Sequence, residues 1–414
     1  MRSIDALVIG AGQAGLAASH ELARLGIGHA VLERGSVAER WRSERWDSLR
    51  LLTPNWMTLL PGYAYAGPHP DGFMSLPEII EYLAGYAAAF GAPVHEQAEV
   101  TALRLLGETW QVESTAGCWR ARSVVIATGH CGVPAVPYFA TELSPSLHQL
   151  PASAYRRPSA LPPGGVLVVG AAASAVQIAE ELRLSGRQVW LSAGRHTRAP
   201  RSYRGRDIWW WMHHVGLLED RAEDQRDLRR AATQPSLQLA GGLPRRDLDL
   251  GALQEMGVRV LGRAIGADGT RMRFADDLPV NVAGAQKPME SMLARIDVAA
   301  DALGAPQQGW PTPPTGFAPT PPEIDLMAEG IRNIVWATGY RHDHGWLRVP
   351  GLLDDAGEVR HRGGIAAIRG VFLLGLRFMR RRSSSFLGGV GIDAAVIAGE
   401  VARHLSHQPG RVAA

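Results

Sequence analysis

The sequence predicts an α/β fold built from two nested Rossmann-like dinucleotide-binding domains, and two observations carry this prediction. First, a unit of apolar strand, glycine-rich turn, helix and second apolar strand occurs twice, with the first strands at residues 6–10 and 166–170. Second, two apolar strands that end in Ala-Thr-Gly, at residues 124–129 and 334–339, alternate with these units. This order along the chain indicates that one nucleotide domain is inserted into another.

The chain of 414 residues is longer than one hydrophobic core usually supports. We expect residues 1–158 and 325–414 to form the outer domain and residues 159–324 to form the inner one. Two proline-rich stretches, at 134–163 and 306–322, fit the places where the chain crosses between the domains. The second stretch fits a surface loop around the inner domain equally well.

The first glycine loop, Gly10-Ala-Gly12-Gln-Ala-Gly15, has the full dinucleotide-binding fingerprint. Gly10 permits a tight turn, Gly12 lets the backbone approach a pyrophosphate, and Gly15 lets helix and strand pack closely. Glu33 ends the next strand, where a carboxylate accepts hydrogen bonds from both ribose hydroxyls and repels a 2′-phosphate. The loop is therefore expected to hold FAD or NAD rather than NADP.

The second loop starts at Gly170 and keeps only this first glycine. Ala172 stands where the backbone would meet phosphate, so its methyl group is expected to loosen cofactor binding. No acid ends the following strand; instead Arg195 and Arg198 come next, with Arg201 and Arg204 after them. Because arginine forms paired hydrogen bonds with phosphate, we interpret this stretch as a 2′-phosphate pocket for NADPH, the alternative being a basic surface loop.

Composition bounds the function. A hydrophobic share of 46% with 20% charged residues is typical of a globular protein, and no apolar run is long enough to span a bilayer, so we expect a cytoplasmic protein without a membrane partner. The net charge of +3 comes from dispersed arginines, which gives no reason to expect a nucleic-acid partner. Cys118 and Cys131 are the only cysteines and do not form the close pair of a disulfide reductase. No metal-ligand cluster is recognisable, so no metal is expected.

Taken in order, the two loops and the two Ala-Thr-Gly strands resemble the class B flavoprotein monooxygenases. This group includes the flavin-containing, the N-hydroxylating and the Baeyer–Villiger monooxygenases. Residues 39–51, with Trp41 and Trp46, also resemble the part of this family that contacts the flavin. The resemblance covers most of the chain and implies FAD at the first loop and NADPH at the second.

The resemblance also implies site residues. Those expected to bind the cofactors are Gly10, Gly12, Gly15, Glu33, Arg34, Trp41, Thr128, Gly129, Gly170, Ser174, Arg195, Gly339 and Asp393. The candidate catalytic residues are Asn55, which lies one residue out of register with a family asparagine, and Ser384 and Phe386, which precede a C-terminal helix expected at 393–404. His148 corresponds to the family's linker histidine, but the phenylalanine and glycine of that signature are missing.

The activity implied is the insertion of one oxygen atom from O2 into a small hydrophobic or aromatic substrate, by N-, S- or C-oxygenation through a C4a-(hydro)peroxyflavin. Two alternatives stay open: Baeyer–Villiger oxidation of a ketone, and a flavoprotein without oxygenase activity that acts as an NAD(P)H reductase or a binding protein. The apolar run at 209–212 fits an aromatic substrate and a packed helix equally well. The sequence leaves the substrate and the oligomeric state open.

Overall fold

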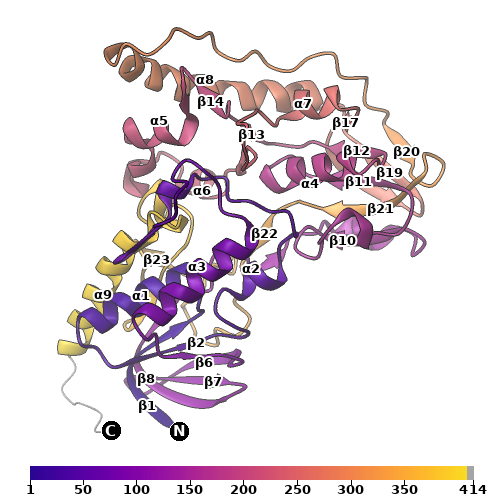
Figure 1. Cartoon of the computed structure of the whole chain (residues 1–414). Helices are drawn as coiled ribbons and strands as arrows, with labels where there is room; N and C mark the ends of the chain where they lie inside the picture. Colours follow the sequence, from indigo (N-terminus) through magenta and orange to yellow (C-terminus); the bar gives the residue numbers. More distant parts are fainter. Residues whose placement is uncertain (408–414) are drawn as a thin grey trace.

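The computed structural model describes residues 1–407 and has two separate sheets, one for each predicted nucleotide domain. Figure 1 shows the sheet that contains β1 and β8 at the end of the molecule where the N-terminus lies, and the sheet that contains β11 and β12 at the other end. The predicted α/β fold with two nested dinucleotide-binding domains is therefore confirmed. Residues 408–414, the last of the expected outer domain, lie outside the described part.

The first sheet has nine strands, and its central strands are parallel. In spatial order its strands are β23 (His361–Arg362), β24 (Ile365–Ala366), β25 (Val371–Leu373), β8 (Gly117–Ile126), β1 (Arg2–Ile9), β2 (His29–Leu32) and β5 (Val94–His95), with β7 (Thr109–Ser114) joined to β8 and β6 (Val100–Leu106) joined to β7. The helices of this part are α1 (Gln13–Arg24), α2 (Glu39–Ser43), α3 (Leu76–Ala89) and α9 (Val390–Ser406). Helix α1 packs against α9 and α3, and α9 also packs against β8 and β25.

The second sheet has five strands, all parallel. In spatial order they are β10 (His148–Pro151), β21 (Ile331–Trp336), β11 (Gly165–Val169), β12 (Val189–Ser192) and β17 (Arg259–Leu261). The helices of this part are α4 (Ala173–Leu184), α5 (Ile208–His214), α6 (Leu228–Ala232), α7 (Leu250–Glu255) and α8 (Leu278–Ala302). All five strands being parallel, with α4 packed on β11 and β12, is the arrangement expected of a nucleotide-binding domain.

Short elements complete the chain. The small strands are β3 (Leu59–Leu60), β4 (Tyr63–Ala64), β9 (Val133–Pro134), β13 (Thr197–Arg198), β14 (Ser202–Tyr203), β15 (Arg206–Asp207), β16 (Leu237–Gln238), β18 (Ala264–Asp268), β19 (Arg271–Phe274), β20 (Glu323–Asp325) and β22 (Tyr340–Arg341). The 3-10 turns are η1 (Asn55–Met57), η2 (Tyr138–Glu142), η3 (Pro158–Ala160), η4 (Leu217–Glu219), η5 (Ala222–Asp224) and η6 (Arg382–Ser385).

Each glycine loop packs against its own Ala-Thr-Gly strand. Gly10 has φ +103°, and a Cβ atom there would lie 2.8 Å from the carbonyl oxygen of Ala127. Gly170 has φ +128°, and a Cβ atom there would lie 2.3 Å from the carbonyl oxygen of Ala337. Both positions therefore require glycine, for the backbone conformation and for the space. The close approach explains why the first glycine persists in the second loop although the other two are gone.

The sheets divide the chain at different positions from those expected. Residues 148–151 and 331–336, which the sequence assigned to the outer domain, form β10 and β21 of the second sheet. The physical reason is the contact between Gly170 and the carbonyl group of Ala337, which holds the second Ala-Thr-Gly strand, β21, beside β11. The two crossings are instead β9 and β22, which pair antiparallel, with Pro134 opposite Tyr340 and Val133 opposite Arg341. The chain thus leaves the first domain and returns to it through one two-stranded ribbon.

The proline-rich stretch at 306–322 does not cross between the domains. It has no helix or strand, and its backbone carbonyls accept hydrogen bonds from side chains of the second domain. Arg204 Nε donates to Pro306 O at 2.8 Å, and Arg198 Nη1 donates to Thr312 O at 2.9 Å. The alternative interpretation, a loop that wraps the inner domain, is therefore the one observed.

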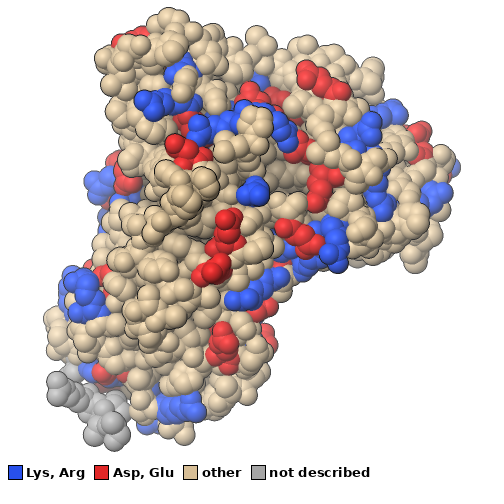
Figure 2. All heavy atoms as spheres, viewed as in Figure 1, with Lys and Arg blue, Asp and Glu red and all other residues tan. Residues whose placement is uncertain are grey.

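Charged residues of both signs are interspersed over the face of the molecule shown in Figure 2, without a continuous basic field. Among the described helices, none is both long enough and apolar enough to cross a membrane.

The Gly170 contact predicts an unequal cost for two glycine-to-alanine substitutions. Gly170→Ala should destabilise the protein by about 3 kcal/mol or more, because it adds a collision with the Ala337 carbonyl to a backbone conformation that only glycine adopts readily. Gly186→Ala is the control, since Gly186 has φ +86° but open space around a Cβ atom, and should cost about 1 kcal/mol. Thermal unfolding of both variants measures the difference; equal losses would contradict the packing argument.

Candidate functional site

A single cavity of about 860 Å³ runs from the first glycine loop to the second domain. One end is lined by Gly10, Gly12, Glu33, Thr128 and Gly129, which lie at the carboxyl ends of β1, β2 and β8. In parallel sheets, ligands bind at this edge. The other end is lined by side chains from α5, α8, β13 and the segment that follows β25. The cavity therefore joins a nucleotide-binding edge to a wall supplied by the second domain.

The first loop has the geometry that a dinucleotide needs. Gly12 is the N-cap of α1 with φ −81° and ψ −173°, and a Cβ atom there would meet nothing within 4 Å. The backbone is thus open toward the cavity at this position. A Cβ atom on Gly15 would lie 1.7 Å from the Gly10 carbonyl oxygen, so this glycine allows helix and strand to touch. The N-terminus of α1 supplies positive potential for a pyrophosphate.

The carboxylate of Glu33 is held at the end of β2, where it lines the cavity. Its Oε2 accepts a hydrogen bond from Ala11 N at 2.6 Å, and its Oε1 accepts one from Gly35 N at 3.2 Å. These bonds fix an acceptor at the position expected for a ribose. The loop and Glu33 therefore fit the adenosine part of FAD.

Arg34, expected to bind a cofactor, and Trp41, expected near the flavin ring, line the cavity as well. Arg34 forms an ion pair with Glu44 beside it, and Trp41 lies on α2 with the guanidinium of Arg45 5.4 Å from its ring centroid. Trp46, the other tryptophan considered, is buried in the hydrophobic core and does not line the cavity.

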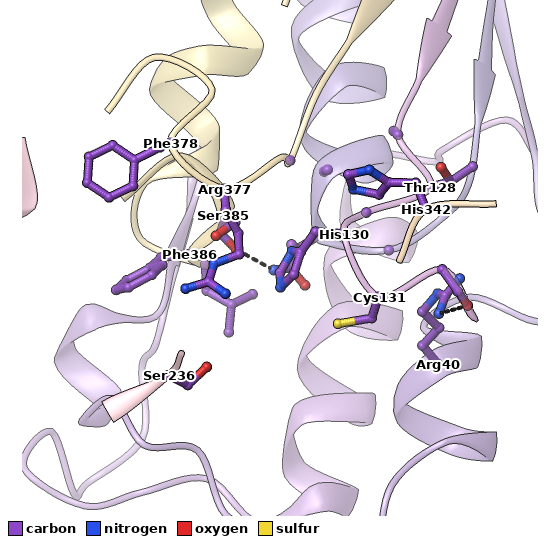
Figure 3. A pocket seen from close by; sticks show the side chains of 18 of the residues that line it. Arg40, Thr128, His130, Cys131, Ser236, His342, Arg377, Phe378, Ser385 and Phe386 are labelled. Atoms are coloured by element: carbon purple, nitrogen blue, oxygen red, sulfur yellow. Dashed lines mark hydrogen bonds between the residues drawn. The ribbon is translucent and has the colours of Figure 1, made fainter. Parts of the chain in front are cut away.

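A group of polar side chains that the sequence did not single out surrounds the middle of the cavity. His130 and Cys131 directly follow the first Ala-Thr-Gly, and Arg377 follows β25. Figure 3 shows all three projecting into the same space. Burial lowers the pKa of His130 to about 4, and the nearby Arg377 adds to this effect. The imidazole is therefore neutral at physiological pH. Their position just past the ends of parallel strands is the signal that could have found them.

The segment after β25 forms one wall of the cavity. Of the two candidate catalytic residues in this segment, Phe386 lines the cavity and Ser384 does not. Phe378 and Phe386 line the cavity, and Phe378 has an unusual φ of +49°. Gln13 Nε2 donates to Ser385 O at 3.0 Å and so joins this wall to the first loop. Ser384, a candidate catalytic residue, is fully buried outside the cavity lining. Its Oγ accepts hydrogen bonds from the backbone N–H groups of Arg380 and Arg381, each at 3.0 Å, and so shapes the turn.

The far wall of the cavity is apolar and aromatic. Trp209 and Met212 of α5 line it, and the ring of Trp209 meets that of Phe386 edge-on at 5.6 Å. Pro288 and Met292 of α8 lie on the same wall. Within the apolar run at 209–212, Trp209 and Met212 thus line the cavity, while Trp211 packs inside the protein and donates its Nε1–H to Tyr203 O at 2.6 Å.

Asn55 does not face the cavity, contrary to expectation. Its side chain is buried, its Nδ2 donates to His69 O at 3.0 Å, and its Oδ1 accepts from Met74 N at 2.8 Å. The amide is therefore used to hold the loop before α3. Its neighbours Leu52 and Thr53 line the cavity instead.

Asp393 also lies outside the cavity lining. It is fully buried in the first turn of α9, with Oδ1 3.5 Å from Arg381 Nη2 and 3.9 Å from Arg380 Nε. Burial raises the pKa of its carboxyl group. The carboxylate of Asp393 therefore faces the arginine-rich turn, and its side chain does not contact the space that a cofactor would occupy in the cavity.

The second loop lies outside this cavity lining: Gly170, Ser174 and Gly339 are absent from it. The loop nevertheless has the backbone of the first one. Ala172 is the N-cap of α4 with φ −86° and ψ −177°, close to the values at Gly12. Its methyl group causes no backbone strain, and the N-terminus of the 12-residue α4 is suited to a second pyrophosphate.

The arginines after the second loop separate into two kinds. Arg198, Arg201 and Arg204 are buried and paired with carboxylates of Asp249, Asp207 and Asp301, at 2.8, 2.8 and 2.7 Å. These three hold the second domain together and are not available as phosphate ligands. Arg195 is exposed, donates to Thr233 O at 3.2 Å, and has no carboxylate partner among the described residues. The expected phosphate pocket is thereby reduced to Arg195. His148 is exposed on β10 and is likewise outside the cavity lining.

The two cysteines lie at opposite ends of β8. Cys118 is exposed near the start of this 10-residue strand, and Cys131 lines the cavity past its end. At about 3.3 Å per residue along a strand, their separation is far beyond the reach of a disulfide. The cavity thus has one thiol and not the pair that a dithiol mechanism uses.

Comparison with known proteins gives the family. Residues 7–206 match the family model described as pyridine nucleotide-disulphide oxidoreductase. The chain is 32% identical over 403 residues to the uncharacterized oxidoreductase CzcO-like of Geobacillus kaustophilus, covering 97% of this chain and 99% of that protein. A shorter part, 43% of this chain and 44% of its relative, is 31% identical to the indole-3-pyruvate monooxygenase YUCCA4 of Oryza sativa.

Among solved structures, the fold is similar to that of the flavin-containing monooxygenase from Stenotrophomonas maltophilia. The TM-score is 0.67 at 21% identity, and the match covers 98% of this chain and 99% of that one. The sequence match to the CzcO-like protein covers nearly the whole chain, and the match in fold covers both nested nucleotide domains. The chain belongs to the family of CzcO-like oxidoreductases and is built like a class B flavoprotein monooxygenase.

Proposed function

We propose that this protein is an FAD-containing, NADPH-dependent monooxygenase that inserts one oxygen atom from O2 into a small hydrophobic or aromatic substrate. One observation carries the proposal: the cavity that begins at the first glycine loop continues without interruption into an aromatic chamber. FAD and NADPH are the cofactors. FAD supplies the redox and oxygen chemistry when bound, and the protein has to position it, orient the substrate and limit the access of water.

The residues of the chain support a division of these tasks. Gly12 and Glu33 would hold the pyrophosphate and ribose of FAD, and Trp41 would lie beside its ring system. Arg377 supplies a half-buried positive charge that lines the cavity, with no carboxylate partner among the described residues. Partial burial lowers the pKa of its guanidinium. Such a group would stabilise negative charge that develops on a bound flavin.

His130 would act through its neutral form. With a pKa of about 4, it carries no charge at pH 7, so one ring nitrogen can accept a hydrogen bond while the other donates. It therefore adds no second positive charge beside Arg377. A neutral imidazole between that arginine and the Ala-Thr-Gly turn would orient a reactant rather than release a proton to it.

The chamber favours an apolar, aromatic substrate. Trp209, Phe378 and Phe386 offer ring faces and edges, and Met212 and Met292 offer adaptable side chains. The rice relative named as an indole-3-pyruvate monooxygenase has a substrate with an aromatic ring, which agrees with such a chamber. We therefore place nitrogen, sulfur or carbon oxygenation of an aromatic compound ahead of Baeyer–Villiger oxidation, and both ahead of a reductase or a binding protein.

A substrate screen tests the activity. The purified protein should bleach on anaerobic mixing with NADPH and, in air, convert one or more of a set of amines, sulfides and indoles to products that are heavier by one oxygen atom. Phe386→Ala should lower the yield of product per NADPH consumed by several-fold while FAD stays bound, because it removes one wall of the chamber. Phe139→Ala, which loses a similar ring that packs on Trp336 outside the cavity, is the control.

The outcomes of this screen separate the alternatives. Oxygen added only to ketones would identify the Baeyer–Villiger reaction. NADPH oxidation with hydrogen peroxide as the sole product over the whole screen would favour a reductase, and no bleaching would favour a binding protein. An equal yield of product per NADPH consumed in Phe386→Ala and the wild type would contradict the assignment of the chamber as the substrate site.

Gly12→Val tests the FAD site. The extended backbone at Gly12 accepts a side chain and the space around it is free, so the variant should fold like the wild type. Its side chain would occupy the place of the pyrophosphate, and the protein should purify colourless. Gly12→Ala should keep a large part of its flavin, since Ala172 has nearly the same backbone angles in the second loop. Absorbance spectra and flavin content decide; a yellow Gly12→Val protein with one FAD per chain would contradict the assignment.

Arg195→Ala tests the preference for NADPH. A charge-assisted pair of hydrogen bonds to phosphate contributes on the order of 1.5–3 kcal/mol, or roughly ten- to a hundredfold in affinity. The variant should raise the KM for NADPH by about this factor and leave the KM for NADH nearly unchanged. Arg271→Ala is the control, because Arg271 is also exposed but pairs with Glu323 on β20. Equal losses for both cofactors, or a wild type that prefers NADH, would show that Arg195 belongs to a basic surface loop.

A further inference from the structure

Two histidines in the cavity wall have no part in the proposed reaction. His342 and His344 directly follow β22, where the chain returns from the second sheet, and both line the cavity. Their rings are stacked with centroids 5.2 Å apart. Glu358, from the loop that leads to β23, forms an ion pair with His342. One ligand atom from each of these three residues lies within 4.8 Å of the others. The sequence showed no such cluster because Glu358 stands outside the short spacing of the two histidines, and the fold of the intervening loop brings it back to them.

Each imidazole is anchored through one ring nitrogen. His342 Nδ1 meets Glu358 Oε2, and His344 Nδ1 donates to Gly357 O at 2.9 Å. In His344 this leaves Nε2 for another partner, which is the arrangement of many metal-binding histidines, in which a carbonyl fixes one nitrogen and orients the other toward the ion. In His342 a bound ion would take the place of the proton between Nδ1 and Glu358 Oε2, so that this nitrogen and the carboxylate would both become ligands.

We propose that His342, His344 and Glu358 form a binding site for a divalent transition-metal ion such as Zn²⁺. Zinc binds imidazole nitrogen and carboxylate oxygen at about 2.0–2.2 Å, so that ligand atoms around it lie about 3.5 Å apart. Atoms within 4.8 Å of one another reach that spacing through small rotations of the side chains. Two imidazoles favour zinc and its neighbours in the first transition series over Mg²⁺ or Ca²⁺, which prefer sites made only of oxygen.

A third imidazole belongs to the same segment of chain as Glu358. His361 is the first residue of β23 and follows Glu358 by three residues. Gly364 N donates to His361 Nδ1 at 3.3 Å, so the other ring nitrogen is available. This histidine or a water molecule would complete a tetrahedral set.

The place of the site in the fold indicates a structural role for the ion. His342 and His344 belong to the crossing that leaves β21, while Glu358 precedes the edge strands of the first sheet. The other crossing is adjacent, since a Cβ atom on Gly132 would lie 2.4 Å from Arg341 O. A bound ion would tie the returning crossing to the first domain and fix the part of the cavity wall that His342 and His344 form, where Figure 3 labels His342 among the lining side chains.

Calorimetric titration with ZnCl2 tests the site directly. The flavin-loaded protein would be freed of metal with a chelator, dialysed, and titrated in excess Mg²⁺. We expect one Zn²⁺ per chain with a Kd in the micromolar range or below. His344→Ala and Glu358→Gln should each weaken binding at least tenfold, because each removes one ligand. His148→Ala, which removes an exposed histidine on β10, should bind like the wild type.

The same variants allow a second readout that does not depend on activity. Zn²⁺ should raise the Tm of the wild type and of His148→Ala, and should not raise the Tm of the His344→Ala, Glu358→Gln double variant. The flavin absorbance of each protein verifies that it is folded, and Glu358→Gln carries the test alone should His344→Ala fail to fold. Binding of clearly less than one equivalent, or equal Zn²⁺ affinity in the wild type and Glu358→Gln, would overturn the proposal.

Discussion

The close approach of each glycine loop to the strand beside it is the constraint on which the rest of this structure depends. Gly10 lies against the carbonyl of Ala127 and Gly170 against that of Ala337, so close that a side chain would not fit. This contact aligns the carboxyl ends of the central strands of each sheet. As a result, the residues that follow each Ala-Thr-Gly motif lie at the ligand-binding edge of a sheet. In the first sheet these residues are His130 and Cys131, which line the same cavity as Gly12.

The nesting of the domains then builds the cavity. Because both crossings run through one ribbon of β9 and β22, the second domain is held close to the first glycine loop, and α5 and α8 contribute its aromatic wall. The buried arginines stabilise this wall from behind. Arg201, for example, pairs with Asp207, donates to Leu52 O at 2.7 Å, and lies over the ring of Phe73. A buried guanidinium is tolerated only when paired in this way, which explains why these arginines are unavailable to a cofactor.

The residues misplaced from the sequence share one cause. Asn55, Ser384 and Asp393 are polar and were expected near the site because they follow, by position along the chain, the pattern of the family that the sequence resembles. In the structure each is buried outside the cavity lining: Asn55 and Ser384 form hydrogen bonds with nearby backbone groups, and Asp393 lies within ion-pair distance of Arg381. A buried polar group must find partners, and turns close to a binding site need such groups as much as the site does. Sequence distance does not distinguish the two roles.

The sequence alone determined the two nucleotide-binding units, the loop of Gly10, Gly12 and Gly15, and Glu33 at the end of its strand. These features are local, since a strand, a turn and a helix lie within about 30 residues and their glycines follow from backbone sterics. Only the tertiary structure decided which sheet received the second Ala-Thr-Gly strand, which arginines were paired, and that Glu358 would meet His342 and His344. Those outcomes depend on side-chain contacts that no repeating pattern in the sequence specifies, because side-chain type leaves several partners open and packing selects one.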